Sequence, residues 1–320
     1  MSFAADRPPG RRRRLSLRWS AVLAVLLVVL GGLAVATDAL GAGRLFDRAV
    51  ARIDRIIAGP VPDRPTIDTV LVTPRPAASP VPTQPASTPS ASTAAAFDAP
   101  SAPPEPHPEP TPSRVPVDLD IAADPAGIFA SEVKDTWCAP AGVQITLAFL
   151  GRADTSVDFQ RELQGRVHEW ESYSDSHNGD WGPAAMALAL DAYGAPGYEV
   201  RAYTSRQDAL RDAATAIETT GSPVILLAWR GAHTWVMTGF RADADPAVFP
   251  DATVAGAYIV DPWYPRVSSI WGPSDPPGTF QDTAEMARNY LAWKRPEGRY
   301  PKRDGLFIAI VPTVKVSAGD

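Results

Sequence analysis

The stretch WCAPAGVQITLAFLG, residues 137–151, decides how the folded part of this chain is built. Apolar residues recur at helical spacing through it, up to the Gly151 that ends the run. Pro140 suits the first turn of a helix, because the backbone N–H groups there have no partner inside the helix. The pattern therefore predicts a helix with Cys138 at its N-terminal end.

The sequence after this helix predicts further helices, and most of the predicted strands come later in the chain. Helices are predicted at residues 157–167, at residues 183–193 and after Ser205, where Asp208 completes a capping box. Short segments rich in β-forming residues predict strands at 198–203, 223–229, 234–240, 257–260 and 306–311. This order indicates an α+β fold, in one folded domain that covers residues 128–320.

The N-terminal part has the pattern of a membrane-attached protein. Residues 1–18 contain six arginines and one aspartate, and residues 19–40 form an apolar run. A run of roughly 20 apolar residues crosses a bilayer, and arginine stays on the cytoplasmic side. We therefore expect a basic cytoplasmic segment at 1–18 and a single transmembrane helix, a signal anchor, at 19–40. The folded domain would then lie outside the cytoplasm, tethered to the cell membrane.

Two further segments separate this run from the folded domain. The small residues Ala34-Val35-Ala36 leave a cleaved signal peptide open as an alternative, which would also export the rest of the chain. Apolar spacing at residues 41–59 predicts a juxtamembrane amphipathic helix. Residues 60–116 hold 17 of the 34 prolines and no periodic hydrophobic face, so residues 60–127 are predicted to be a disordered linker rich in Pro, Ser, Thr and Ala.

Composition excludes several classes of function. Beyond residue 18 the chain carries 24 basic and 35 acidic residues, which argues against a nucleic-acid partner. The sequence has no HExxH, GxSxG or phosphate-loop motif and no Cys/His cluster with metal-ligand spacing, so we expect neither a cofactor nor a metal. Cys138 is the only cysteine, and an unpaired thiol in an exported protein is a candidate reactive group.

A cysteine nucleophile needs a stabilised thiolate, a base within hydrogen-bond reach and a third group that orients the base. Cys138 lies where free helix N–H groups and the helix dipole favour an anion. His233 begins a predicted strand after the Gly231-Ala232 turn, and Asp261 follows the strand at 257–260. Each of these residues alone more often has a structural role. The other histidines lie in polar surroundings: His107, His168 and His177.

Three motifs in this order resemble the bacteriocin-processing cysteine peptidases and their stand-alone relatives, the cysteine peptidase family 39-like proteins. They are Trp137-Cys138-Ala139-Pro140-Ala141, the stretch GAHTWVMTGF at 231–240, and Tyr258-Ile259-Val260-Asp261-Pro262. The resemblance covers roughly residues 129–270 and implies a papain-like fold, in which an N-terminal helix carries the cysteine and an antiparallel sheet carries the histidine and aspartate. It implies Cys138 as nucleophile, His233 as base and Asp261 as the orienting residue.

The chain departs from the family pattern before the cysteine. The family usually has a glutamine six residues before the cysteine that stabilises the oxyanion, and here that position is Glu132. A carboxylate there repels both thiolate and oxyanion, unless it is protonated or turned away. Lys134 or backbone N–H groups around Cys138 are alternative oxyanion donors.

A second departure is the long segment between the histidine and the aspartate. It contains Asp243, Asp245 and Asp251, and we interpret it as a solvated loop near the cleft, with a substrate- or cation-binding lid as the alternative. Trp235 and Trp263 flank the two sites and are predicted to line the cleft.

Three functions remain open from the sequence. The first is a thiol hydrolase, a peptidase or amidase, acting on an extracytoplasmic peptide or peptide-like substrate. The second is an inactive papain-fold module that binds peptide or cell wall, which Glu132 favours. The third is a transglutaminase-like acyl transferase, for which the separation of 95 residues between Cys138 and His233 is long.

Overall fold

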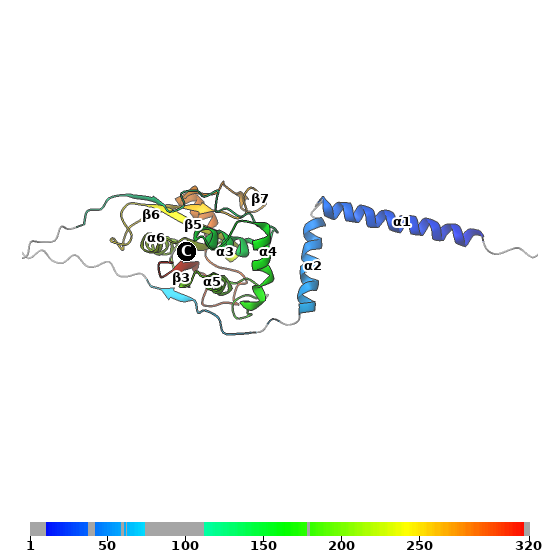
Figure 1. Cartoon of the computed structure of the whole chain (residues 1–320), viewed down its shortest axis with the longest axis horizontal. Coiled ribbons are helices and arrows are strands. Elements are labelled where there is room, and N and C mark those ends of the chain that lie inside the picture. Colours follow the sequence, from blue (N-terminus) through cyan, green and yellow to red (C-terminus); the bar gives the residue numbers. More distant parts are fainter. Residues whose placement is uncertain are drawn as a thin grey trace, which may run out of the picture. The chain divides into compact units, whose positions relative to one another are not determined.

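The structure is a computed structural model that describes residues 11–37, 42–58, 61, 63–73, 112–177 and 180–316 (Figure 1). The chain divides into two units, residues 1–60 and residues 61–320.

The first unit contains two helices. α1 covers Arg11–Ala36, and α2 covers Ala42–Ala58, where the amphipathic helix was predicted. Leu45, Phe46 and Ile57 are exposed on α2. Within the residues that the structure describes, no helix combines the length and the apolar character that a membrane crossing requires. The transmembrane helix predicted at residues 19–40 is therefore not supported.

An eight-stranded sheet forms the centre of the second unit. Seven strands follow one another in the order β1-β3-β10-β4-β5-β6-β9, and β2 pairs with β5. All neighbours are antiparallel except β1 and β3, which are parallel. The strands are β1 (Val70–Val72), β2 (Val117–Asp120), β3 (Tyr198–Tyr203), β4 (Val224–Ala228), β5 (His233–Ala242), β6 (Val254–Val260), β9 (Thr279–Asp282) and β10 (Phe307–Pro312). A separate two-stranded sheet pairs β7 (Val267–Ser268) with β8 (Gly272–Pro273).

Helices cover both faces of the large sheet. One face packs against α3 (Cys138–Phe149), α4 (Val157–Gly165) and α5 (Pro183–Ala192), and the other against α6 (Arg206–Thr220) and α7 (Thr283–Asn289). Strand β4 shows why this sandwich forms, since it is apolar throughout. Its Ile225 and Leu227 join the core on the α3 side, and its Val224, Leu226 and Ala228 join the core on the α6 side. A strand that is buried on both faces has no polar alternation.

The structure confirms the predicted α+β class and the predicted helices and main strands. α3 starts at Cys138, and the hydroxyl of Ser205 accepts the N–H of Asp208 at 3.1 Å at the start of α6, as the capping box predicts. The prediction missed α7 and the short strands β1, β2, β7, β8 and β9.

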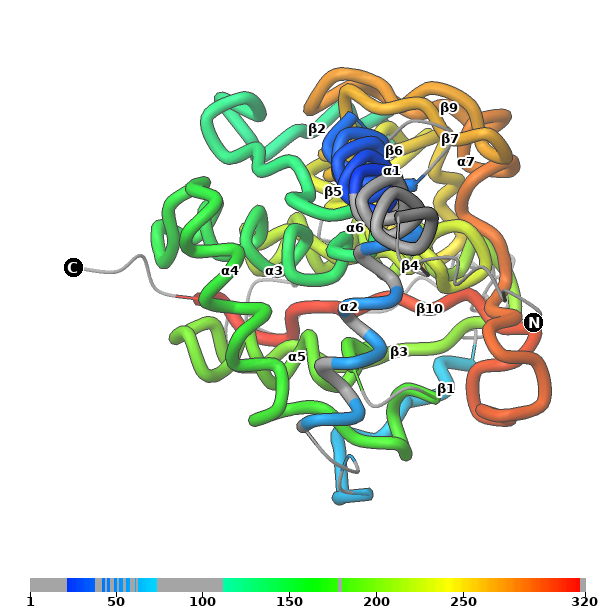
Figure 2. The backbone as a smooth tube through the Cα atoms, turned by 90° about the vertical axis from the view of Figure 1, so that its right-hand side faces the viewer, coloured from blue at the N-terminus to red at the C-terminus, as the bar shows by residue number. Residues whose placement is uncertain are grey.

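The structure contradicts the predicted disorder at both ends of residues 60–127. Residues 63–72, which we call the strap, lie on the folded domain, and Figure 2 shows β1 beside β3. Arg64 fixes the strap, because its guanidinium donates to the carbonyl oxygens of His168 at 3.0 Å and Glu169 at 2.9 Å. β2, at the other end, pairs with β5. Partners more than 100 residues away order these short segments, and proline content does not reveal such partners. The rest of the predicted linker, residues 74–111, lies outside the described residues.

Candidate active site

The N-terminus of α3 meets the start of β5. Cys138 is the first residue of α3 and His233 is the first residue of β5. The helix approaches the strand closely at Gly142, where an added Cβ would lie 2.3 Å from Cγ2 of Thr234. Only a residue without a side chain permits this approach. The close approach brings the predicted cysteine and histidine together.

The predicted histidine and aspartate form a buried pair. Nε2 of His233 lies 2.7 Å from Oδ1 of Asp261, and the two side chains are 2% and 8% exposed. The same Oδ1 accepts the backbone N–H of Trp263 at 2.8 Å. The carboxylate therefore fixes the ring through Nε2–H, and Nδ1 is left to exchange a proton with Cys138.

Cys138 is half-buried beside this pair, with its Sγ 3.9 Å from the carbonyl oxygen of Ala232. Burial alone would lower the pKa of His233. The charge of Asp261, its hydrogen bond and the interactions with Cys138 outweigh burial and raise the pKa of His233 to about 10. The imidazole is therefore protonated at neutral pH.

Trp229 holds the imidazole from one side. Its ring stacks on His233 with centroids 4.0 Å apart and planes inclined by 20°, and its Nε1–H donates to Oδ1 of Asn289 at 3.1 Å. Trp229 and Arg230 have φ values of 51° and 64°, in the left-handed region that side chains other than glycine rarely adopt. Two such residues in succession, in the turn that leads to His233, indicate backbone strain at a functional site.

The two tryptophans predicted to line the cleft have different positions. Trp263 meets His233 edge-on, with centroids 6.3 Å apart and planes at 83°. Trp235 instead packs into the core on the α6 side, where it also lines a cavity of about 20 Å³ next to Asp261. The sequence did not predict a site role for Trp229, because a tryptophan at the end of a strand reads as core.

Glu132 is buried beside the histidine and the aspartate. Its side chain is fully buried, and neither carboxyl oxygen has a hydrogen-bond partner among the described residues. Burial raises the pKa of Glu132 to about 7, although the positive charges of His233 and Arg266 oppose the rise. Near pH 7 about half of the molecules thus carry a neutral carboxyl group, which can donate a hydrogen bond. Sequence reasoning could not choose between this neutral form and a repelling carboxylate.

Arg266 joins the loop before Cys138 to the loop after Asp261. Its Nη2–H donates to the carbonyl oxygen of Glu132 at 2.6 Å and its Nη1–H to Oδ1 of Asp135 at 2.9 Å. The backbone N–H of Glu132 donates to the carbonyl oxygen of Pro262 at 3.0 Å. These bonds fix the backbone of Glu132, and Nη1 of Arg266 lies 3.8 Å from its Oε1. A lone arginine in a loop has no motif or periodicity, so the sequence gave no signal for it.

The other predicted polar groups have partners of their own. The ammonium of Lys134 sits 5.2 Å from the ring centroid of Trp137. In the acidic loop, Asp243 and Asp251 pair with Arg114 at 3.4 and 2.9 Å, with both carboxylates more than half exposed. These contacts support the solvated-loop interpretation.

Comparison with known proteins gives one family. The model of the Peptidase_C39 like family matches residues 123–295. Among solved structures, the chain is similar to a double glycine motif protease from an AMS/PCAT transporter, crystallised in complex with the leader peptide. The identity is 16% and the TM-score 0.28, and the match covers 58% of this chain and 91% of that one. No curated protein matches the chain.

Proposed function

The chain belongs to the peptidase C39-like family, and we propose that its papain-like domain is a thiol hydrolase of peptide or amide bonds. Cys138 is the proposed nucleophile, His233 the proton carrier and Asp261 the group that orients the imidazole. The observation that carries the proposal is the buried pair of His233 and Asp261, 2.7 Å apart, with Cys138 on the remaining ring nitrogen.

The proposed reaction has two halves. The thiolate of Cys138 attacks the carbonyl carbon, and the imidazolium of His233 gives its proton to the departing amine, which leaves a thioester on the sulfur. The thioester no longer carries the thiolate charge that helps to raise the pKa of His233. The imidazole is then a better base for the water that attacks the thioester carbon. The sulfur leaves as thiolate, and the proton from water restores the imidazolium.

Glu132 supports a hydrolase rather than an inactive binding module when its carboxyl group is neutral. A tetrahedral intermediate needs hydrogen-bond donors directed at the oxyanion, and a neutral carboxyl supplies an O–H where a carboxylate would repel the charge. Because burial places the pKa of Glu132 near 7, the neutral form exists at physiological pH. The proposed donor is thus available mainly below pH 7.

The second candidate is the binding module. The ionised form of Glu132 favours it, because a carboxylate repels both thiolate and oxyanion. The two candidates predict different pH profiles for acylation by p-nitrophenyl acetate, a small activated ester that needs no substrate pocket. A hydrolase releases one equivalent of p-nitrophenolate in a burst and carries an acetyl group on Cys138, seen by mass spectrometry. We expect the burst rate of the unmodified chain to fall above about pH 7.

Three variants complete this test. Glu132→Gln, with a permanent amide donor, should keep its burst rate above pH 7, and Cys138→Ala should show no burst. The binding module is the better function if the unmodified chain is not acylated at any pH. The same holds if His233→Ala is acylated as fast as the unmodified chain.

We also propose that the domain acts outside the cytoplasm, on a peptide or peptide-like substrate. The support is the arginine cluster at residues 1–18 followed by the apolar run at 19–40. Protease added to cells with permeabilised outer layers and an intact inner membrane should cut the chain ahead of the folded domain. Complete protection until the inner membrane is lysed would place the domain in the cytoplasm.

A further inference from the structure

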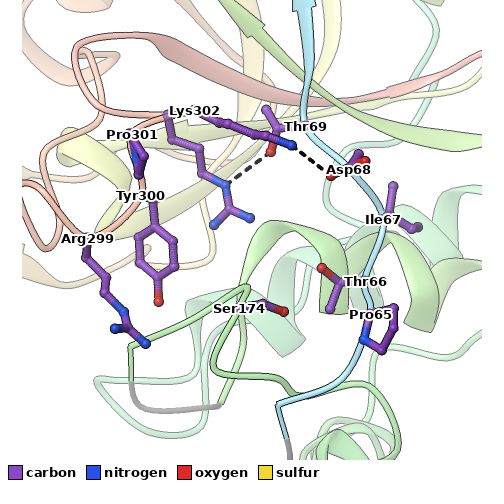
Figure 3. Close-up of a pocket in the computed structure, with 11 residues that line it drawn as sticks. Pro65, Thr66, Ile67, Asp68, Thr69, Ser174, Arg299, Tyr300, Pro301 and Lys302 are labelled. Carbon is purple, nitrogen blue, oxygen red and sulfur yellow. Dashed lines mark hydrogen bonds and ion pairs between the residues drawn. The ribbon is translucent and has the colours of Figure 1, made fainter.

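A second cavity lies between two segments that are far apart in the sequence (Figure 3). The strap forms one wall with residues 65–69, a loop before β10 forms the other with residues 299–303, and Ser174 lies between them. The volume is about 470 Å³, which is within the range of small-molecule sites. Cys138, His233 and Asp261 do not line this cavity, so it is separate from the candidate active site.

Two of the three cations that line the cavity already have acidic partners. Arg303 is 4% exposed and donates to Oδ1 and the carbonyl oxygen of Asp175 at 2.6 and 2.7 Å. Lys302 pairs with Asp68 at 3.0 Å across the cavity wall. Both carboxylates are therefore engaged, and a cationic ligand would have to break these pairs.

Arg299 is the third cation, and none of the described carboxylates neutralises its charge. It is exposed, and its Nη2–H reaches the carbonyl oxygen of Tyr173 at a long 3.4 Å. No carboxylate pairs with it among the residues that the structure describes. Figure 3 shows its guanidinium next to the ring of Tyr300, whose hydroxyl oxygen is buried. The hydroxyl of Thr66 points toward the cavity from the strap side.

We propose that this cavity binds a small molecule with a carboxylate group. The guanidinium of Arg299 receives the carboxylate, because a planar fork of N–H donors matches two carboxylate oxygens. The hydroxyl group of Thr66 adds a donor, and Pro65 and Ile67 offer apolar surface for the rest of the ligand. One unneutralised cation matches one negative charge, so a phosphate dianion fits less well.

The ligand would also act on the strap. Since it contacts Thr66 on one wall and Arg299 on the other, bound ligand adds a bridge between the strap and the loop of residues 299–303. Anything that binds only the docked form stabilises that form. Ligand binding should therefore slow the release of the strap from β3, whether or not the domain is a hydrolase.

The test uses benzoate on the full chain, with benzamide as the uncharged probe of the same shape and inorganic phosphate as the competing anion. We expect benzoate to bind in ligand-observed NMR and to slow amide hydrogen exchange in residues 63–73. Arg299→Ala should weaken binding at least about tenfold, because it removes charge-assisted hydrogen bonds. Arg295→Ala removes an exposed arginine of the same loop that does not line the cavity, and it should leave binding unchanged.

Each other result overturns the proposal. No benzoate binding at roughly 10 mM would exclude a site of useful affinity. Equal binding by benzamide would show that the negative charge is not recognised, and equal binding by Arg299→Ala would show that the arginine is not the receptor. Phosphate that displaces benzoate with higher affinity would replace the carboxylate assignment by a phosphate site. Unchanged exchange in residues 63–73 on benzoate binding would remove the bridge to the strap.

Discussion

Replacing Glu132 by glutamine should remove a large pH-dependent loss of folding stability. The carboxyl has a pKa of about 7 in the folded domain and an ordinary value of 4.5, and burial causes the difference. Between these values the unfolded chain releases its proton while the folded chain keeps it, so the free energy of unfolding falls as pH rises from 4.5 to 7. Above pH 7 the folded domain holds a buried carboxylate, and the loss reaches about 3 kcal/mol.

The assay is urea unfolding of the unmodified chain and of Glu132→Gln at pH 5 and pH 8. Glutamine has nearly the same shape and no charge, so the variant should gain about 2–3 kcal/mol over the unmodified chain between pH 5 and pH 8. Comparing the two chains cancels the other titrating groups, including His233. Glu297→Gln makes the same chemical change at an exposed carboxylate and should show no comparable gain. An equal stability difference at both pH values would refute the burial of Glu132 and, with it, the neutral donor.

Three further predictions follow from the site and the strap. His233→Ala should slow alkylation of Cys138 by iodoacetamide at pH 6 by at least about tenfold, since the imidazolium that stabilises the thiolate is lost; an unchanged rate would remove the ion pair. Gly142→Ala should destabilise the domain by about 1–3 kcal/mol in urea unfolding, because its Cβ meets Thr234; an unchanged midpoint would mean that α3 lies farther from β5. A chain that starts at residue 112 lacks β1 and should show faster amide exchange in β3 than the full chain, and equal exchange would mean that the strap does not dock.

The order and positions of the main elements could be predicted because local patterns determine them. The apolar spacing after Cys138 gives α3, the capping box at Ser205 gives α6, and β-forming runs give the strands that precede His233 and Asp261. Side chains at the ends of neighbouring strands come together when the strands pair, so the histidine–aspartate contact follows from the pairing of β5 with β6. Three candidate residues could thus be named from sequence order alone.

Only the tertiary structure decided the ionisation of Glu132, the hydrogen bonds by which Arg266 joins two loops, and the docking of the strap. A pKa depends on how much water surrounds a group and on which charges face it, and three of the charged groups that act on Glu132, those of His233, Asp261 and Arg266, lie more than 100 residues away in the sequence. The strap contains a three-residue strand, β1, which is too short to show a period, and it becomes ordered through hydrogen bonds from β3 and contacts of Arg64. Local sequence sets the preference of each segment for helix or strand, whereas burial and long-range pairing depend on partners that are adjacent only once the chain has folded.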